Sequence, residues 1–91
     1  MSEPADFEWD EAKRASNRER HGVDFAEIAG MDWTSALVVE DDRQDYGERR
    51  FLVIGRIGGR LHVAVITPRG ERFRVISLRK ANKREEGRYG A

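Results

Sequence analysis

Arginine is the residue of this sequence whose number and spacing most directly indicate chemistry. Fourteen of the 17 lysines and arginines are arginine, and four of these lie on or beside strands that we expect to be neighbours: Arg50, Arg69, Arg74 and Arg79. A guanidinium group presents a rigid fork of donors that matches phosphate oxygens, whereas lysine would serve a merely soluble surface equally well. A single arginine commonly forms a surface ion pair, but four together favour a phosphate site. By strict alternation Arg74 and Arg79 fall on opposite faces of their strand, so a bend near Ser77 is needed if they converge.

The sequence lacks the residues or the spacing that several other kinds of site require. Cysteine is absent, which excludes thiol catalysis, disulfides and thiolate metal sites and fits a reducing compartment. Ser77 has no plausible His–Asp partners for acyl transfer. The acidic run from Glu40 to Asp45 lacks the spacing of a calcium loop, so we expect no metal ion and no cofactor. The glycines of GRIGGR do not lead into a helix, which argues against a phosphate-cradling loop.

The N-terminal part of the chain is predicted to form a tail and two helices. Residues 1–6 read as a flexible tail, and the alternation of Phe7, Glu8 and Trp9 predicts a short extended entry whose rings are more typical of core anchors than of base stacking. A first helix follows from an Asp10 cap to about Arg20. A second helix follows an Asp24 cap, with Glu27 at capping-box spacing, and ends at Gly30 or soon after.

The remainder alternates with a period of two and predicts strands. We expect them at Ala36–Glu40, Arg49–Arg56, Leu61–Thr67 and Arg72–Leu78. Gly58-Gly59 predicts a two-residue hairpin turn, and Pro68–Gly70 a second turn. Ala81–Tyr89 can form a short helix. We therefore predict one α+β domain over residues 1–91: two N-terminal helices, a three- to four-stranded antiparallel meander sheet and a short C-terminal helix.

The charges are divided between the two halves of the chain. Residues 1–45 carry 5 Lys and Arg against 13 Asp and Glu, whereas residues 46–91 carry 12 against 4. Such polarity predicts a basic face for phosphates or carboxylates beside an acidic N-terminal part. No apolar run is long enough to span a membrane, and the acidic N-terminus is unlike a signal peptide, so we expect a cytoplasmic protein without membrane contacts.

Three stretches of the chain resemble the BrnT toxins. They contain W-D-x-x-K and H-G-V-x-F within residues 7–25, G-E-x-R within residues 45–67, and R-x-I-S-x-R-K-A and E-x-x-x-Y within residues 74–89. Two positions depart from the family pattern, namely Met31–Thr34 and Leu78, and both concern packing rather than the charged residues. The resemblance implies a RelE-like fold and the toxin of a type II toxin–antitoxin system, a small ribonuclease that inhibits translation and growth.

Metal-independent RNA cleavage requires a base for the 2′-hydroxyl, cations for the phosphorane and an acid for the leaving 5′-oxygen. The base and acid stay open among Glu48, His62, Glu85 and Tyr89, although a lone strand histidine is more often structural, as is His21 at a helix end. With the resemblance taken into account, the expected catalytic residues are Glu48, Arg50, Arg74, Arg79 and Tyr89. The expected RNA phosphate ligands are Arg69, Lys80 and Lys83.

The resemblance also implies a protein partner. This would be a BrnA-like ribbon-helix-helix antitoxin that neutralises the toxin and binds the operator DNA, which the toxin itself would contact only through the antitoxin. The toxin could form a homodimer, or a heterotetramer with the antitoxin. Composition and periodicity alone would equally support a non-catalytic nucleic-acid-binding module or a domain that binds an acidic protein.

Overall fold

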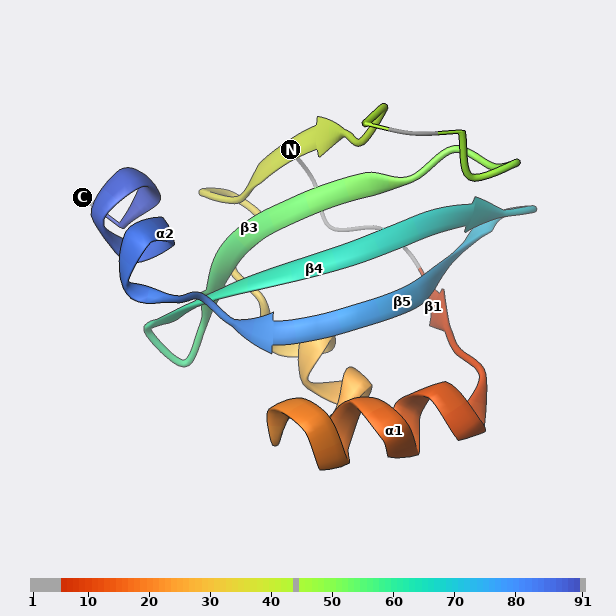
Figure 1. Ribbon diagram of the computed structural model, residues 1–91, viewed down its shortest axis with the longest axis horizontal. Helices are drawn as coiled ribbons and strands as arrows, with labels where there is room; N and C mark the ends of the chain where they lie inside the picture. Colours follow the sequence, from red (N-terminus) through yellow and green to blue (C-terminus); the bar gives the residue numbers. More distant parts are fainter. Residues whose placement is uncertain (1–5, 44, 91) are drawn as a thin grey trace.

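The computed structural model describes residues 6–43 and 45–90 and shows an α+β arrangement (Figure 1). Along the chain the elements are β1 (Phe7–Glu8), α1 (Glu11–His21), the 3₁₀ helix η1 (Phe25–Gly30), β2 (Leu37–Glu40), β3 (Phe51–Ile57), β4 (Arg60–Arg69), β5 (Arg72–Lys80) and α2 (Lys83–Tyr89). The predicted tail lies outside the described residues except for Asp6, whose carbonyl accepts from the Phe73 N–H. No helix in the described ranges is both long and apolar enough to cross a membrane.

The sheet is larger than predicted and is mixed. Its five strands lie in the order β1-β5-β4-β3-β2, so the expectation of three or four antiparallel strands is wrong. The four longer strands form an antiparallel meander, but Phe7 and Glu8 pair in parallel with Phe73 and Arg74. We expected Phe7, Glu8 and Trp9 to be a short extended entry and did not predict that Phe7 and Glu8 form a strand of the sheet. Two residues carry no detectable periodicity, and their partner lies 66 residues along the chain, so local pattern cannot reveal the pairing.

The expectation of two N-terminal α-helices is also wrong, because the second segment is a single short 3₁₀ helix. The predicted Asp24–Glu27 capping box is present, yet capping signals describe only a first turn and do not distinguish α from 3₁₀ structure. Gly30 then ends the helix after six residues. By contrast, α1 has the expected Asp10 cap and ends at Gly22, whose φ of 71° is left-handed.

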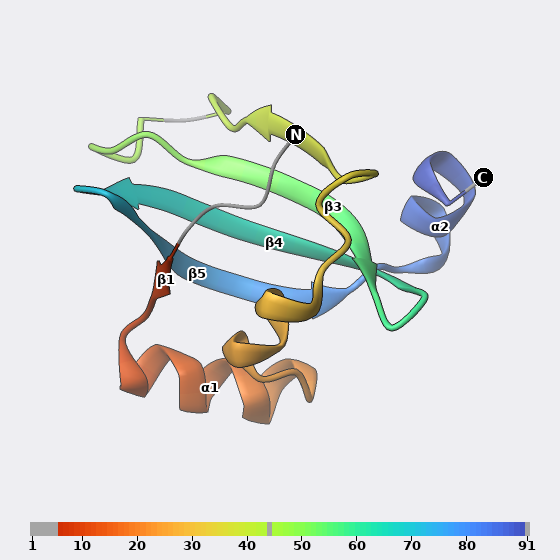
Figure 2. The same ribbon diagram turned by 180° about the vertical axis from the view of Figure 1, so that it is seen from behind.

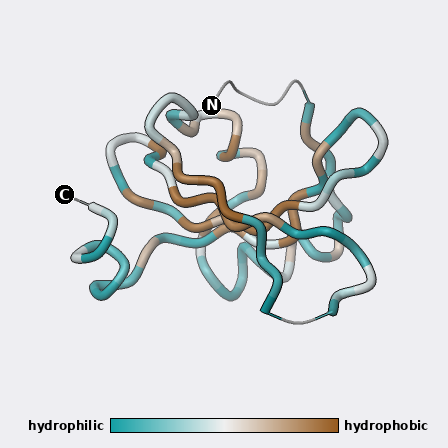
Figure 3. Tube along the Cα trace, turned by 90° about the horizontal axis from the view of Figure 1, so that it is seen from above, coloured by the Kyte–Doolittle hydropathy of each residue, from teal (hydrophilic) through white to brown (hydrophobic). Residues whose placement is uncertain are grey.

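One face of the sheet is covered by α1 and η1. Seen from behind, η1 and the connection from it to β2 cross in front of the strands, whereas in Figure 1 they lie behind them (Figure 2). The fully buried side chains of this layer come from η1 and from the central strands, and they include Phe25, Ile28, Val53, Ile66 and Leu78. Figure 3 shows these hydrophobic segments gathered in the middle of the molecule. We call the opposite side of the sheet the open face.

A β-bulge at Ile76 decides which arginines point to the open face. Val65 pairs with Ser77 and Ile66 with Val75, so Ile76 is an extra residue in β5. Because the bulge resets the alternation, Arg74 and Arg79 lie opposite Thr67 and Val63, which are four residues apart on β4 and face the same way. The bulge takes the place of the bend that we expected near Ser77.

The helix α2 lies beyond the end of the sheet at which β4 begins and β5 ends (Figure 1). It starts at an Asn82 cap rather than at Ala81, and Glu85 completes a capping box by accepting from the Asn82 N–H. Ala81 is buried with Ile54, Leu61 and Val63, the apolar residues at this end of the open face.

Candidate active site on the open sheet face

The strand register divides the open face into a cationic part and an apolar part. One row across the sheet runs from Glu8 through Arg74 to Thr67. The next two rows begin with Ser77 and Arg79 on β5 and continue through apolar residues of β4 and β3 to β2, namely Val65, Leu52 and Val39 in one and Val63, Ile54 and Leu37 in the other. Cations therefore gather on the β5 side of this face, and aliphatic side chains gather toward β2.

Glu48 joins two of the predicted arginines just before β3. The Arg50 Nε donates to Glu48 Oε2 at 3.1 Å, and the Arg69 Nη2 lies 3.8 Å from Glu48 Oε1. We call these three residues the Glu48 cluster. They come from the segment just before β3 and from the last residue of β4. Their side chains are between a quarter and a half exposed, so a ligand can reach them. A carboxylate between two guanidinium groups combines a proton acceptor with two phosphate-binding cations.

The polar loop before β3 contacts this cluster through the Tyr46 ring, which lies against Arg50. Asp41, whose side chain is 2% exposed, accepts from the Arg43 guanidinium and from the Tyr46 hydroxyl at 3.1 Å. The hydrogen bonds from Arg43 hold the pKa of Asp41 well below its usual range. The Arg50 guanidinium in turn lies 4.2 Å from the centre of the Tyr46 ring. The loop thus orients Arg50 through a chain of three contacts.

Arg74 lies on the same end of the open face and is held by β1. Its Nη2 donates to Glu8 Oε2 at 3.0 Å, while its Nε is buried without a hydrogen-bond partner among the described residues. Phe7, the neighbour of Glu8, stacks on Trp33 with ring centres 5.6 Å apart. This stacking anchors β1 in the core and so places the Glu8 carboxylate over Arg74.

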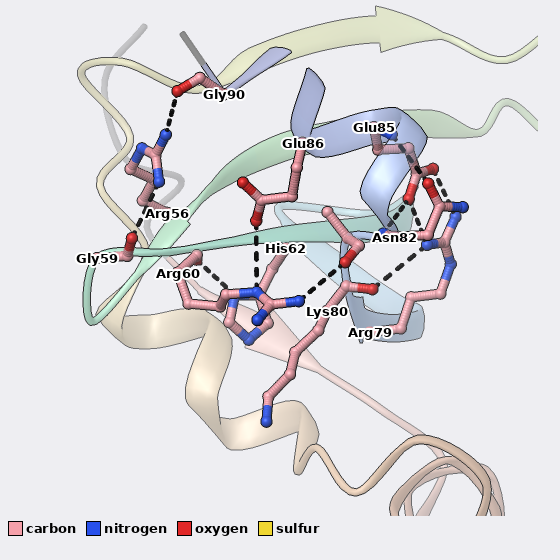
Figure 4. A network of polar contacts seen from close by, with 11 residues as sticks. Arg56, Gly59, Arg60, His62, Arg79, Lys80, Asn82, Glu85, Glu86 and Gly90 are labelled. Atoms are coloured by element: carbon pink, nitrogen blue, oxygen red, sulfur yellow. Dashed lines mark hydrogen bonds and ion pairs between the residues drawn. The ribbon is translucent and has the colours of Figure 1, made fainter. Parts of the chain in front are cut away.

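Arg79 is held by α2 at the other end of the face. Its two terminal nitrogens donate to the two Glu85 oxygens at 2.8 and 2.9 Å, as Figure 4 shows. These hydrogen bonds lower the pKa of Glu85 from an ordinary 4.5 to about 2 and raise the pKa of Arg79. Glu85 is therefore ionised at neutral pH and has no proton to give, which argues against it as a general acid.

The structure does not bring all predicted site residues together. Thr67 and Val63, the β4 partners of Arg74 and Arg79, are separated by four residues, or about 13 Å along the strand. Tyr89 lies on α2 at the Arg79 end. Lys80 is exposed, pairs with His62 and points to the face opposite that of Arg79. Lys83 is exposed at the first turn of α2. Glu48, Arg50, Arg69 and Arg74 thus form one group, and Arg79, Lys83 and Tyr89 form another.

The histidines lie away from both groups. His62 is 3% exposed, points to the covered face and has its Nδ1 2.7 Å from the Arg60 carbonyl oxygen. His21 is the last residue of α1, where a cation would favour the helix dipole. Within residues 6–43 and 45–90, no three His, Asp or Glu side chains are placed together to bind a metal ion.

Three contributors to the site were missed in the sequence, namely Glu8, Asp41 and Tyr46. A signal for Tyr46 exists, because it directly precedes the G-E-x-R motif that contains Glu48 and Arg50. Asp41 belongs to an acidic loop that we treated only as a possible cation site. Glu8 has no sequence signal, because its contact with Arg74 depends on the parallel pairing of β1 and β5.

A protein-family model described as a ribonuclease toxin, BrnT, of type II toxin–antitoxin systems matches residues 9–85. No curated protein matches the chain. The family match confirms the resemblance inferred from the motifs. Its range includes the Glu48 cluster, Arg74 and Arg79 but ends before Tyr89 and starts after Glu8.

Proposed function

Because the chain belongs to the BrnT family of ribonuclease toxins of type II toxin–antitoxin systems, we propose that it cleaves RNA on the open sheet face without a metal ion. The observation that carries this proposal is the Glu48 cluster, in which one carboxylate touches two arginines within reach of solvent. Attack of the 2′-hydroxyl on the adjacent phosphorus would leave a 2′,3′-cyclic phosphate and a 5′-hydroxyl end.

The roles follow from the two groups of residues. Glu48 is the proposed base, and Arg50, Arg69 and Arg74 would stabilise the negative charge that develops on the phosphorane. Arg79 lies about 13 Å along the sheet from Arg74, and we propose that Arg79 and Lys83 bind a flanking phosphate. Tyr89 belongs to that distant end, so we assign it no part at the reacting phosphate. The leaving 5′-oxygen would take its proton from solvent, which reaches the partly exposed Glu48 cluster.

The partner that the family implies is an antitoxin. We propose that it is a BrnA-like ribbon-helix-helix protein, that both proteins act in the cytoplasm, and that the toxin reaches operator DNA through the antitoxin, as part of a heterotetramer or as a homodimer when free. The chemistry and the partner are tested separately.

The chemistry is tested by incubating the purified chain with RNA in EDTA and analysing the product ends. We expect cyclic phosphate and 5′-hydroxyl ends from the wild type and a rate at least a hundredfold lower from Glu48→Gln, since general bases contribute roughly 10²–10⁴-fold. Glu40→Gln is the matched control, because Glu40 also pairs with an arginine, Arg49, but on the covered-face side of the sheet. A requirement for Mg²⁺, or 5′-phosphate ends, would contradict the mechanism. Salt-dependent RNA binding without any cleavage would instead favour a non-catalytic binding module.

A further inference from the structure

The large apolar side chains that stay exposed gather at one corner of the open face. Among the described residues they are Leu37, Val39 and Tyr89, which are 45, 46 and 38% exposed. Leu37 and Tyr89 line the same pocket of about 370 Å³, whose other apolar walls include Ile54 and Leu61. We call Leu37, Val39 and Tyr89 the β2 corner. Exposed apolar clusters of this kind mark surfaces that bind a partner.

The two edges of the sheet differ in whether their backbone groups are already paired. On the β5 side, β1 pairs with Phe73 and Arg74, and the Asn17 side chain bonds the N–H and the carbonyl of Leu78. Both contacts prevent a further strand from pairing there. On the opposite edge, β2 pairs only with β3, and no strand in the described part of the chain lies on its outer side. An unprotected edge that carries aliphatic side chains is a template for an added strand.

The charge of the β2 corner is positive. Arg56 and Arg88 line the pocket, and among the described residues no carboxylate does. The Arg56 guanidinium donates to the carbonyls of Gly59 and Gly90 and so fixes the end of α2 against the sheet, as Figure 4 shows. Arg88 lies over the Tyr89 ring with a separation of 5.5 Å. A segment that combines apolar and acidic side chains would satisfy both the aliphatic walls and the two arginines.

We propose that an extended apolar and acidic segment of the antitoxin adds to the outer edge of β2 and places an apolar side chain in the pocket of the β2 corner. A protein fits better than RNA here, because the corner offers aliphatic walls and free backbone groups, whereas the two carboxylate-paired arginines of β5, Arg74 and Arg79, lie on the other side of the face. The proposal rests on the antitoxin partner that family membership implies. It does not depend on the assigned catalytic residues.

The test measures the affinity of the antitoxin encoded beside this chain for the full-length toxin and its variants by calorimetry. The double variant Leu37→Ser/Val39→Ser is expected to lose at least tenfold in affinity. Its control is Ile76→Ser, which removes a partly exposed aliphatic side chain from β5, on the other side of the sheet. Arg88→Glu is expected to lose affinity more strongly at low salt than at high salt. Arg84→Glu, the same change on α2 at an exposed residue outside the pocket, is its control.

Thermal melting of each variant and binding of an uncleavable 2′-deoxy oligonucleotide are measured alongside. Unchanged antitoxin affinity in both the double variant and Arg88→Glu, with normal melting, would overturn the proposal. So would a free toxin that sediments as a dimer and becomes monomeric in the double variant, since the edge would then bind a second copy. If the corner variants lose affinity for the oligonucleotide but keep their affinity for the antitoxin, the β2 corner binds RNA, and the proposal is overturned as well. If the wild type fails to cleave RNA but antitoxin affinity changes as expected, the proposed function falls and this inference stands.

Discussion

Two adjacent arginines show how the sheet separates charge that we propose to be catalytic from structural charge. Arg50 precedes β3 on the open face, pairs with Glu48 and covers the Tyr46 ring. Arg49 pairs with Glu40 and lies 5.1 Å from the centre of the Phe51 ring. Neighbouring residues of an extended chain point to opposite faces, so the two guanidinium groups serve different surfaces.

We expect Arg50→Ala to lower the rate of RNA cleavage at least tenfold, because a cation aimed at the phosphorane is worth about 1.4 kcal/mol or more of barrier. Arg49→Ala, one position away, should stay within about twofold of the wild type. Single-turnover rates at saturating toxin, with melting curves as a control for folding, measure both. Equal losses in the two variants would show that the effect is not specific to the open face.

The four predicted site arginines share a second property, which is that each is held by a carboxylate. Glu48 contacts Arg50 and Arg69, Glu8 contacts Arg74, and Glu85 contacts Arg79. Such pairs orient a guanidinium before the substrate arrives, at the cost that a phosphate must compete with the carboxylate. The arrangement favours positioned donors over maximal positive potential.

At the scale of elements, α1 is fixed to the sheet by one side chain. Asn17 is 6% exposed, and its amide nitrogen donates to the carbonyls of Val23 and Leu78 while its oxygen accepts from the Leu78 N–H. It therefore occupies the position that a neighbouring strand would take beside β5.

Asn17→Ala should lower the free energy of unfolding by about 2 kcal/mol, since it leaves buried backbone groups of Leu78 without partners. For a domain of this size that corresponds to a melting temperature roughly 10 °C lower. Ser16→Ala is the control: it brings a similar gain in helix propensity on the same helix, but Ser16 is exposed. Equal melting of the two variants would show that the Asn17 contacts do not stabilise the fold.

The helix α2 makes the stability of the fold depend on pH. The pKa of Glu85 is lowered by its hydrogen bonds with Arg79 to about 2. A carboxylate whose pKa is depressed in the folded state contributes stability above its unfolded pKa and loses it as the pH falls through the folded value. The contribution of this pair is therefore complete above about pH 4.5 and disappears toward pH 2.

We expect the wild type to lose stability over that acid range and Glu85→Gln to lose less, because the variant has no carboxylate to titrate. Melting temperatures from pH 6 to pH 2 for both proteins provide the measurement. Glu86→Gln is the control on the same helix, since Glu86 makes a longer ion pair of 3.4 Å with Arg60. Parallel curves for wild type and Glu85→Gln would contradict the assignment.

At the scale of the whole molecule, the open face carries two kinds of surface. The arginines from β5 and from the segments flanking β3 and β4 suit a polyanion, and the aliphatic rows toward β2 suit a protein segment. The acidic first half of the sequence supplies α1 and η1, which lie on the other side of the sheet. Four of the five lysines and arginines of residues 1–45 lie in α1, so the charge difference between the two halves of the chain does not become a simple difference between the two sides of the molecule.

Binding of an uncleavable single-stranded oligonucleotide should therefore weaken steeply with salt. If three or four phosphates are contacted, the logarithm of the binding constant should fall with the logarithm of salt concentration with a slope of about −2 to −3. Arg74→Ala should reduce that slope by about 0.7, whereas Arg18→Ala on α1 should leave it unchanged. Fluorescence anisotropy from 50 to 300 mM salt measures the slopes, and a flat dependence in the wild type would argue against a phosphate-binding face.

Much of this protein is determined by the sequence by itself. The Asp10 and Asp24 caps, the stop at Gly22 and the Gly58-Gly59 hairpin are all present, because each depends on residues within a few positions of one another. Gly58 and Gly59 both have the positive φ that their turn requires. The family, too, follows from local motifs such as the one that contains Glu48 and Arg50, and the family match confirms it.

The tertiary structure decided which of the candidate residues share a surface. The parallel pairing of β1 with β5, the bulge at Ile76 and the burial of Asn17 all depend on partners far away in the chain. Periodicity reports only which positions alternate, so one extra residue in β5 was enough to move Arg79 to the face of Arg74. The 3₁₀ form of η1 was hidden as well, because its cap resembles that of an α-helix.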